Sequence, residues 1–280
     1  MEIDFTGISI SIPFYDDTQR AQKCLDSIYR SSLQLSPEDR KRVELYLIDD
    51  ASPQPFTYRE SPIDFVYHRL DKNCGVGTAR NAGARLAKYS HLCFVDSDVV
   101  LDETALSVMF EVLQGKAPKV LKGALSKTPA NDNPTLFHYY MSISWNLLFI
   151  DYWWCGGWSL CTVFTCDFFS KLGGFCEQYP DSGGEEFGIA SKLWAEDPEA
   201  VLFDERFVVY HHYDTLPGRL KKIFNRSPRL RETLMQHQGI PLKFKILAGL
   251  RVFFSLLLTV LMVSVVLEPF RAVTLYILTG

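Results

Sequence analysis

Two carboxylates stand one residue apart at the end of an apolar run, in Phe94-Val95-Asp96-Ser97-Asp98. The run His91–Val95 has the length and apolar character of a buried strand. Side chains alternate along a strand, so Asp96 and Asp98 should leave its end in the same direction. Neighbouring carboxylates repel each other, and a divalent cation between them relieves the repulsion. The pair therefore indicates a site for a divalent cation, with a turn that caps the next helix as the alternative.

Two further acidic pairs stand at the borders of expected elements. Asp49-Asp50 ends an apolar run that we interpret as a strand over residues 43–48. Glu185-Glu186 opens an expected helix after two glycines. The N-terminus of a helix favours ionised carboxylates, and an ionised carboxylate can accept the proton of a hydroxyl group. For both pairs, capping of a turn or helix is the alternative.

A glycine-bearing loop, Asn73–Gly83, runs into an expected helix over residues 77–87. Backbone amides in such a loop, together with the helix N-terminus, attract phosphate groups. Gly75-Val76-Gly77 lacks the third glycine of the dinucleotide-binding fingerprint, which disfavours a dinucleotide cofactor.

Strands and helices are expected to alternate through the first 115 residues, which predicts a doubly wound, mostly parallel nucleotide-binding half. Ligands bind such sheets at the carboxyl ends of the strands, where the acidic pairs stand. The expected strands cover residues 8–12, 43–48, 63–68 and 91–95, and the expected helices cover 17–33, 77–87 and 102–113. Beyond them we expect a loop over 115–135, an aromatic-rich segment over 137–158, a strand over 160–164, a helix from Glu185 to Trp194, and strands over 201–203 and 208–210.

Charge is unevenly distributed along the 280 residues. Residues 1–215 carry 19 Lys or Arg and 31 Asp or Glu, whereas residues 216–251 carry nine Lys or Arg and only one acidic residue. A basic stretch can bind nucleic acid, but an apolar run over 246–267 follows this one, and the combination favours anionic lipid over nucleic acid. A helix of that run would be about 33 Å long, enough to cross a bilayer. A helix lying in the plane of the interface is the alternative.

The seven cysteines form no C-x-x-C pair, and the acidic N-terminus has no signal-peptide pattern, which together indicate reduced thiols in a cytosolic setting. We therefore expect three parts: a catalytic domain over residues 1–217, a basic juxtamembrane segment over 218–245, and membrane-associated helices over 246–280.

The order of these motifs resembles that of the family 2 glycosyltransferases, over about residues 7–215. The resemblance implies the GT-A fold, an α/β architecture with a Rossmann-like nucleotide-binding half and an acceptor-binding half. The segments that carry it are Ile8–Tyr15, Leu47–Ser52, Asn73–Gly83, Phe94–Asp98, Cys155–Gly157, Leu172–Phe175 and Gly183–Glu186.

The resemblance also implies roles for individual residues. The donor nucleotide would contact Pro13, Tyr15, Asp50, Asn73, Gly75, Arg80, Asp96 and Ser97. A divalent cation, Mn²⁺ or Mg²⁺, would be held by Asp96, Asp98 and His211, with His212 as the alternate ligand. Glu186 would be the catalytic base, although the family usually has aspartate at that position, and Glu185 would contact acceptor or sugar hydroxyls. The acceptor would bind at Trp154, Gly156, Gly157 and Trp158, where a packed aromatic core is the alternative.

The activity that follows from the resemblance is inverting, metal-dependent transfer of a sugar from a nucleotide sugar, with UDP favoured. The basic and apolar C-terminal segments suggest a lipid-linked or polysaccharide acceptor in cell-surface glycan synthesis, at the cytoplasmic face of a membrane, a bacterial inner membrane being favoured. Two alternatives stay open at this point: a nucleotidyltransferase that makes a nucleotide sugar, and a non-catalytic, donor-binding membrane partner of another synthase.

Overall fold

The structure is a computed structural model that describes residues 4–57, 64–151, 160–178 and 185–222. The chain divides into two compact units, Met1–Gly239 and Ile240–Gly280, and every element named below belongs to the first. Among the described helices, none combines the length and the apolarity needed to cross a membrane. The expected membrane-associated run over 246–267 lies outside the described residues, as does most of the basic segment before it.

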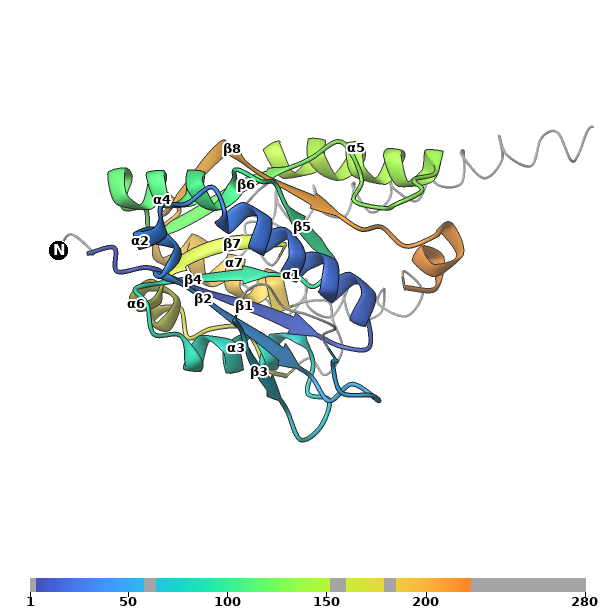
Figure 1. The fold of residues 1–280 in the computed structure, drawn as a ribbon, viewed down its shortest axis with the longest axis horizontal. Coiled ribbons are helices and arrows are strands. Elements are labelled where there is room, and N and C mark those ends of the chain that lie inside the picture. Colours follow the sequence, from blue (N-terminus) through green and yellow to red (C-terminus); the bar gives the residue numbers. More distant parts are fainter. Residues whose placement is uncertain (1–3, 58–63, 152–159, 179–184, 223–280) are drawn as a thin grey trace, which may run out of the picture. The chain divides into compact units, whose positions relative to one another are not determined.

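Eight strands form one sheet in the order β3-β2-β1-β4-β7-β6-β8-β5 (Figure 1). Their bounds are β1 Ile8–Phe14, β2 Val43–Asp49, β3 Val66–Arg69, β4 His91–Val95, β5 Val99–Leu101, β6 Val120–Leu125, β7 Cys161–Thr165 and β8 Val201–His211.

The expected parallel half is confirmed, because β3, β2, β1 and β4 pair in parallel. The rest of the sheet is mixed: β7 is antiparallel to both β4 and β6, β8 is parallel to β6, and β5 is antiparallel to β8. As a result β1, β2, β4 and β8 all run in one direction, and their carboxyl ends meet at one edge of the sheet.

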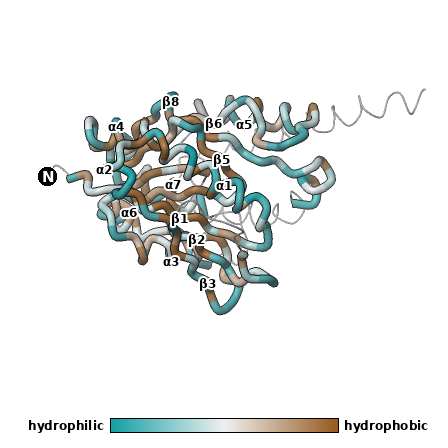
Figure 2. Tube along the Cα trace, in the orientation of Figure 1, coloured by the Kyte–Doolittle hydropathy of each residue, from teal (hydrophilic) through white to brown (hydrophobic). Residues whose placement is uncertain are grey.

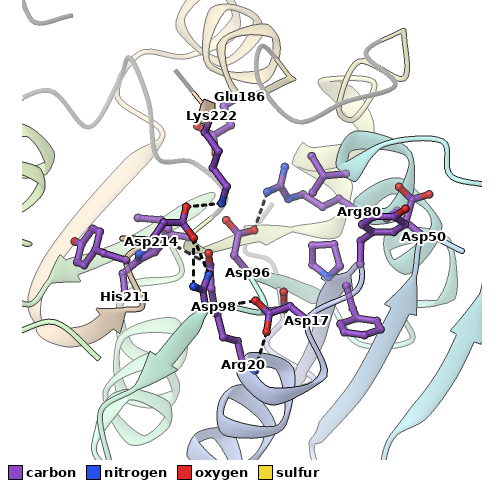
Figure 3. Close-up of a pocket in the computed structure, with 18 of the residues that line it drawn as sticks. Asp17, Arg20, Asp50, Arg80, Asp96, Asp98, Glu186, His211, Asp214 and Lys222 are labelled. Atoms are coloured by element: carbon purple, nitrogen blue, oxygen red, sulfur yellow. Dashed lines mark hydrogen bonds and ion pairs between the residues drawn. The ribbon is translucent and has the colours of Figure 1, made fainter. Parts of the chain in front are cut away.

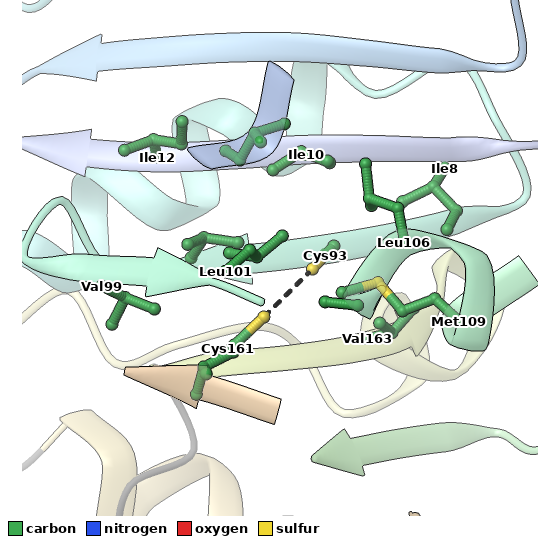
Figure 4. Packing of buried hydrophobic residues seen from close by; sticks show 14 of the residues in the cluster. Ile8, Ile10, Ile12, Cys93, Val99, Leu101, Leu106, Met109, Cys161 and Val163 are labelled. Atoms are coloured by element: carbon green, nitrogen blue, oxygen red, sulfur yellow. Dashed lines mark hydrogen bonds between the residues drawn. The ribbon is translucent and has the colours of Figure 1, made fainter. Parts of the chain in front are cut away.

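Helices cover both faces of this sheet, whose strands are largely hydrophobic (Figure 2). Alternate residues of β1 and β4, among them Ile10 and Cys93, pack with α1 and α4 on one face (Figure 4). The intervening residues of β4, such as Phe94, pack with α6 and α7 on the other face, where α3 packs on β2. The helix bounds are α1 Thr18–Ser32, α2 Pro37–Arg40, α3 Val76–Leu86, α4 Ala105–Lys116, α5 Leu136–Asp151, α6 Cys166–Lys171 and α7 Glu185–Glu196.

Two expectations about the second half of the chain are wrong. The expected loop over 115–135 contains β6, which lies inside the sheet between β7 and β8. Its apolar pattern is interrupted by Lys122, which is fully buried, and by Gly123, onto which Phe207 packs closely. The two expected late strands are one continuous strand, β8, whose register against β6 shifts at Gly123. The three-residue strand β5 was too short to show a pattern.

Small residues let α3 approach β1 closely. A Cβ on Gly83 would lie 1.9 Å from Ser11 Oγ and 2.7 Å from Ser11 Cβ. Ser11 is fully buried, so neither partner can move into solvent. This contact fixes the helix that carries Arg80 against the sheet.

Replacing Gly83 with alanine should therefore destabilise the fold by about 1–3 kcal/mol through overpacking. Gly115→Ala is the matched control, because its added Cβ would meet no atom within 4 Å. Alanine is the better helix former, so this control should be neutral or should stabilise the protein by up to about 1 kcal/mol. Urea unfolding of both variants measures the difference, and equal effects at the two sites would contradict the packing described.

Candidate active site

The converging strand ends surround a cavity of about 570 Å³ (Figure 3). Its walls come from the ends of β1, β2, β4 and β8, from the start of α3, and from α5 and α7. The sequence-predicted site residues that line it are Pro13, Tyr15, Asp50, Asn73, Gly75, Arg80, Asp96, Ser97, Asp98, Glu185, Glu186 and His211. The four expected acceptor residues, Trp154, Gly156, Gly157 and Trp158, lie outside the described residues.

Asp50 holds the glycine-bearing loop at the mouth of the cavity. Its Oδ1 accepts a hydrogen bond from the amide of Cys74 at 2.7 Å, and its Oδ2 accepts one from the amide of Gly75 at 2.8 Å. Burial raises the pKa of Asp50, and the two amides oppose that shift. Gly75 has φ 90°, a conformation that side chains disfavour, and it is the N-cap of α3. The expected contact of Asp50 with a base stays a prediction, since both its oxygens already fix the loop.

Arg80 bridges two carboxylates that belong to different elements. Its Nη2 lies 2.7 Å from Asp96 Oδ1, and its Nη1 lies 3.1 Å from Glu185 Oε1. The side chain is only 2% exposed, and its guanidinium lies over the ring of Phe175 at 5.1 Å. Both terminal nitrogens of Arg80, which we expected to contact the nucleotide, are therefore engaged by carboxylates of the protein.

This bridge separates the roles of the two glutamates at the start of α7. Glu185 is 3% exposed and is held by Arg80, whereas Glu186 is half-buried at the cavity wall. Of the pair, Glu186 is the more accessible to a ligand. Both stand in the first turn of α7, where the helix dipole favours the ionised form.

Asp96 has an unusual acidity for a carboxylate. Burial raises its pKa to about 7, the cation of Arg80 lowers it, and nearby Asp98 raises it. Burial and the neighbouring Asp98 both disfavour a negative charge on Asp96, and a cation between the two carboxylates would relieve both effects.

His211 faces Asp98 because β5 and β8 pair antiparallel, with Val99 opposite His211. His211 Nε2 lies 3.4 Å from Asp98 Oδ1, and the ring of Trp145 stacks on the imidazole with centroids 5.8 Å apart. Burial lowers the pKa of His211, which keeps the imidazole neutral near pH 7, the form that binds metal ions. Its Nδ1 is buried and has no hydrogen-bond partner among the described residues.

His212, the alternate ligand, is buried and does not line the cavity. Burial lowers its pKa to about 4, and its amide donates to the carbonyl of Asp98 at 2.8 Å. Of the two adjacent histidines, the geometry therefore places His211 at the cavity.

The side chains at this site are of the types that bind a divalent cation, but they are not grouped closely enough to coordinate one. In the part of the chain that the structure describes, no three His, Cys, Asp or Glu side chains are grouped closely enough to hold a metal ion. Asp98 and neutral His211 nevertheless offer an oxygen and a nitrogen close to each other, and Mn²⁺ accepts both kinds of ligand. Asp96 lines the same cavity and would join them by giving up part of its contact with Arg80.

A series of ion pairs on the cavity wall beside His211 was not predicted from the sequence. Asp214 Oδ1 lies 3.2 Å from Arg20 Nη2, and Asp214 Oδ2 lies 2.6 Å from Lys222 Nζ (Figure 3). Arg20 also contacts Asp17 at 3.3 Å. Arg20 stands on α1 without any motif around it. Lys222 belongs to the basic stretch after residue 215, whose cations we had assigned to lipid.

Replacing Arg80 with glutamine should leave buried carboxylates without their cation and cost about 3 kcal/mol of stability. Loss of the Arg80 cation raises the pKa of Asp96 further above the pKa that Asp96 has in the unfolded chain. The folded state then holds more protons than the unfolded state, so stability falls as pH rises. The deficit relative to wild type should be larger at about pH 8 than at about pH 5.

Urea unfolding in EDTA at both pH values measures this deficit. Arg85→Gln on the same helix is the control, because the Arg85 side chain is 64% exposed and its Nη1 lies 3.6 Å from Glu177 Oε1. It should change stability by less than about 1 kcal/mol at either pH. A pH-independent deficit for Arg80→Gln would contradict the bridge.

Known proteins resemble this chain in sequence and in fold. The family described as Glycosyl transferase family 2 matches residues 9–165, more than half of the chain. The glycosyltransferase GlyG of Streptococcus pneumoniae is 24% identical over 142 residues, which cover 48% of this chain and 44% of that protein. The uncharacterized glycosyltransferase EpsJ of Bacillus subtilis is 26% identical over 117 residues, which cover 39% of this chain and 30% of that protein. The matches thus span less than half the length of these curated relatives.

Solved structures show the same fold at low identity. TarS of S. aureus in complex with UDP-GlcNAc has a TM-score of 0.57 at 13% identity, covering 85% of this chain and 69% of that one. The mannosyltransferase PcManGT of Pyrobaculum calidifontis, in complex with GDP-Man and Mn²⁺, has a TM-score of 0.56 at 14% identity. The match covers 82% of this chain and 63% of that one. The expected GT-A architecture of the described domain is confirmed.

Proposed function

Because the chain belongs to the family 2 glycosyltransferases, we propose that it transfers a sugar from a nucleotide-activated donor to an acceptor hydroxyl, with inversion at the anomeric carbon. One observation supports this most strongly. Every described residue that the motifs single out for donor, metal and base lies on the same cavity, although these residues come from strands, helices and loops that are far apart in the sequence.

A nucleoside diphosphate sugar, with UDP favoured, fits the charges of this cavity. Arg20, Arg219 and Lys222 line one wall and can balance the negative charge of a diphosphate. Tyr15 is 49% exposed at the cavity mouth, beside the loop that Asp50 holds, where its ring can stack on a base. Solved structures of similar fold bind UDP-GlcNAc in one case and GDP-Man in another, and both ligands are of this class.

Glu186 is the proposed base. Its carboxylate takes the proton of the acceptor hydroxyl while the hydroxyl oxygen forms a bond to the anomeric carbon. The bond from that carbon to the diphosphate oxygen breaks, and its electron pair leaves with the nucleoside diphosphate. Attack from the face opposite the leaving group gives inversion in a single displacement. Glu185, held by Arg80, is a positioning residue that fixes the first turn of α7.

Asp98 and His211, joined by Asp96, would hold Mn²⁺ or Mg²⁺. When bound, such an ion offsets the negative charge that develops on the leaving diphosphate. The protein's own part is to keep the His211 imidazole neutral by burial and to aim it by stacking on Trp145.

The remaining parts of the proposal rest on the sequence. The acceptor is a lipid-linked or polysaccharide glycan, bound in part at Trp154–Trp158. The basic segment over 218–245 and the helices over 246–280 hold the catalytic domain, residues 1–217, at the cytoplasmic face of a membrane.

A screen of nucleotide sugars with purified full-length protein tests the function. Mn²⁺-dependent thermal stabilisation by one of them, with slow release of its nucleoside diphosphate, is the expected result. Binding without turnover under any acceptor condition would favour a non-catalytic partner. Consumption of a nucleoside triphosphate with release of pyrophosphate would favour a nucleotidyltransferase.

Glu186→Gln should reduce transfer by roughly 100-fold or more while leaving donor affinity within about twofold of wild type, because the amide cannot accept the proton. Single-turnover transfer and donor titration measure the two effects. Glu185→Gln is the comparison: it should lower stability as well as activity, because its partner Arg80 is buried. Normal turnover by Glu186→Gln would remove Glu186 from the role of base.

Asp98→Asn should weaken Mn²⁺ binding by about tenfold or more, since a neutral amide is a poorer ligand than a carboxylate. Calorimetric titration with Mn²⁺, followed by donor turnover across metal concentrations, measures the change. His212→Gln is the control, because His212 does not line the cavity and should leave the metal dependence unchanged. Full activity of Asp98→Asn at low Mn²⁺ would overturn the metal assignment.

A further inference from the structure

Helix α5 has two apolar faces with different surroundings. On its inner side Phe137, Met141 and Trp145 line the cavity. Ser142 on the buried side donates to the carbonyl of Ser126 at 2.8 Å, and Asn146 donates to that of Leu125 next to it. These contacts dock the helix on β6 and leave its opposite side outward.

The outward side is apolar and exposed. Leu136 is 83% exposed, Ile143 is 44% exposed and Tyr139 is 40% exposed. Their spacing of three and four residues places them on one face of the helix. We name these three residues the outer stripe of α5. A helix face that stays in water normally carries charged side chains. Residues 133–150 nevertheless contain no Asp, Glu, Lys or Arg, which is a run of 18 residues.

Cations lie next to this helix. The guanidinium of Arg219 lies over the ring of Trp145 at 5.5 Å, which brings the short helix over residues 216–222 against α5. Lys221 on the same short helix is exposed. Arg219 is the first of the nine Lys or Arg residues that residues 216–251 contain. Helix α5 thus stands beside the start of the most basic part of the chain, with Arg219 on its cavity side and Lys221 exposed on the neighbouring short helix.

An uncharged apolar stripe that contains a tyrosine, together with an exposed lysine on the neighbouring short helix, matches the chemistry of an anionic bilayer surface. We propose that the outer stripe of α5 docks on anionic lipid headgroups and their upper acyl chains, with the exposed cation of Lys221 against the lipid phosphates. This contact is distinct from any made by the apolar run over 246–267. Figure 1 shows α5 at the periphery of the fold, on the other side of the sheet from α3 and α6.

The docking has a consequence for the acceptor, which rests on the proposed function. The same helix that meets the membrane with Leu136 and Ile143 meets the cavity with Phe137 and Met141. A glycan attached to a membrane lipid would therefore reach the cavity within the width of one helix. Its acceptor hydroxyl would arrive from the α5 side, opposite the loop that Asp50 holds.

Tryptophan depth in vesicles tests the contact locally, using full-length protein. Tyr139→Trp places the probe on the outer stripe, and Leu33→Trp places it at a 46% exposed apolar position at the end of α1. With phosphatidylglycerol vesicles that contain brominated lipid, the fluorescence added by the Tyr139→Trp probe should be quenched by at least about half. The fluorescence added by the Leu33→Trp probe should not be quenched. Absence of quenching at position 139 in vesicle-bound protein would overturn the proposal, whatever holds the chain to the membrane.

A charge-insertion pair gives the second measurement. Leu136→Glu combined with Ile143→Glu should weaken partition into phosphatidylglycerol vesicles by roughly tenfold, whereas Leu33→Glu should not. Neither substituted residue lines the cavity, so the double variant should keep wild-type thermal stabilisation by a nucleotide sugar. If the wild-type protein also shows no thermal stabilisation by a nucleotide sugar, that result contradicts the proposed function. The vesicle result is independent of it. Unchanged partition together with unquenched Tyr139→Trp would assign membrane contact to the other segments alone.

Discussion

The salt bridge of Arg80 with Asp96 and Glu185 is the interaction on which the rest of the site depends. It joins the end of β4 to the first turn of α7, two elements that carry the proposed metal and base functions. The guanidinium is the shared partner of both carboxylates, and its loss would leave the two negative charges without a cation. The close contact of Gly83 with Ser11 holds the same helix on the sheet, so packing and electrostatics fix Arg80 together.

Charge is separated across the cavity. Asp96, Asp98 and Glu186 face it from the strand and helix ends, while Arg20, Arg219 and Lys222 face it from α1 and the segment after β8. Asp214 holds Arg20 and Lys222 in place, which keeps those cations from pairing with the acidic side. Asp17 and Asp214 line the same wall and pair with Arg20 and Lys222, so the positive charge of this wall is already partly compensated.

Local patterns predicted the first half of the fold well and the second half poorly. Strand β1 alternates isoleucine and serine, whereas β2 and β4 are mostly apolar, and each of the three ends in a turn or an acidic pair. In contrast, the apolar pattern of β6 is interrupted by the buried Lys122 and by Gly123, and Gly123 contacts Phe207, which is far away in the sequence. The cations of the site were missed for a similar reason: Arg20 has no local motif, and its partner Asp214 is 194 residues away.

By itself the sequence determined that the acidic residues after β2 and β4 gather at the cavity, because parallel strands end at one edge of the sheet and their terminal residues must meet there. Only the tertiary structure decided what each neighbour does. The pairing of β5 with β8 turns His211, and not His212, toward Asp98. Arg80 takes Glu185 out of solvent and leaves Glu186 at the cavity wall. These choices depend on contacts between residues more than a hundred positions apart, which no local spacing encodes.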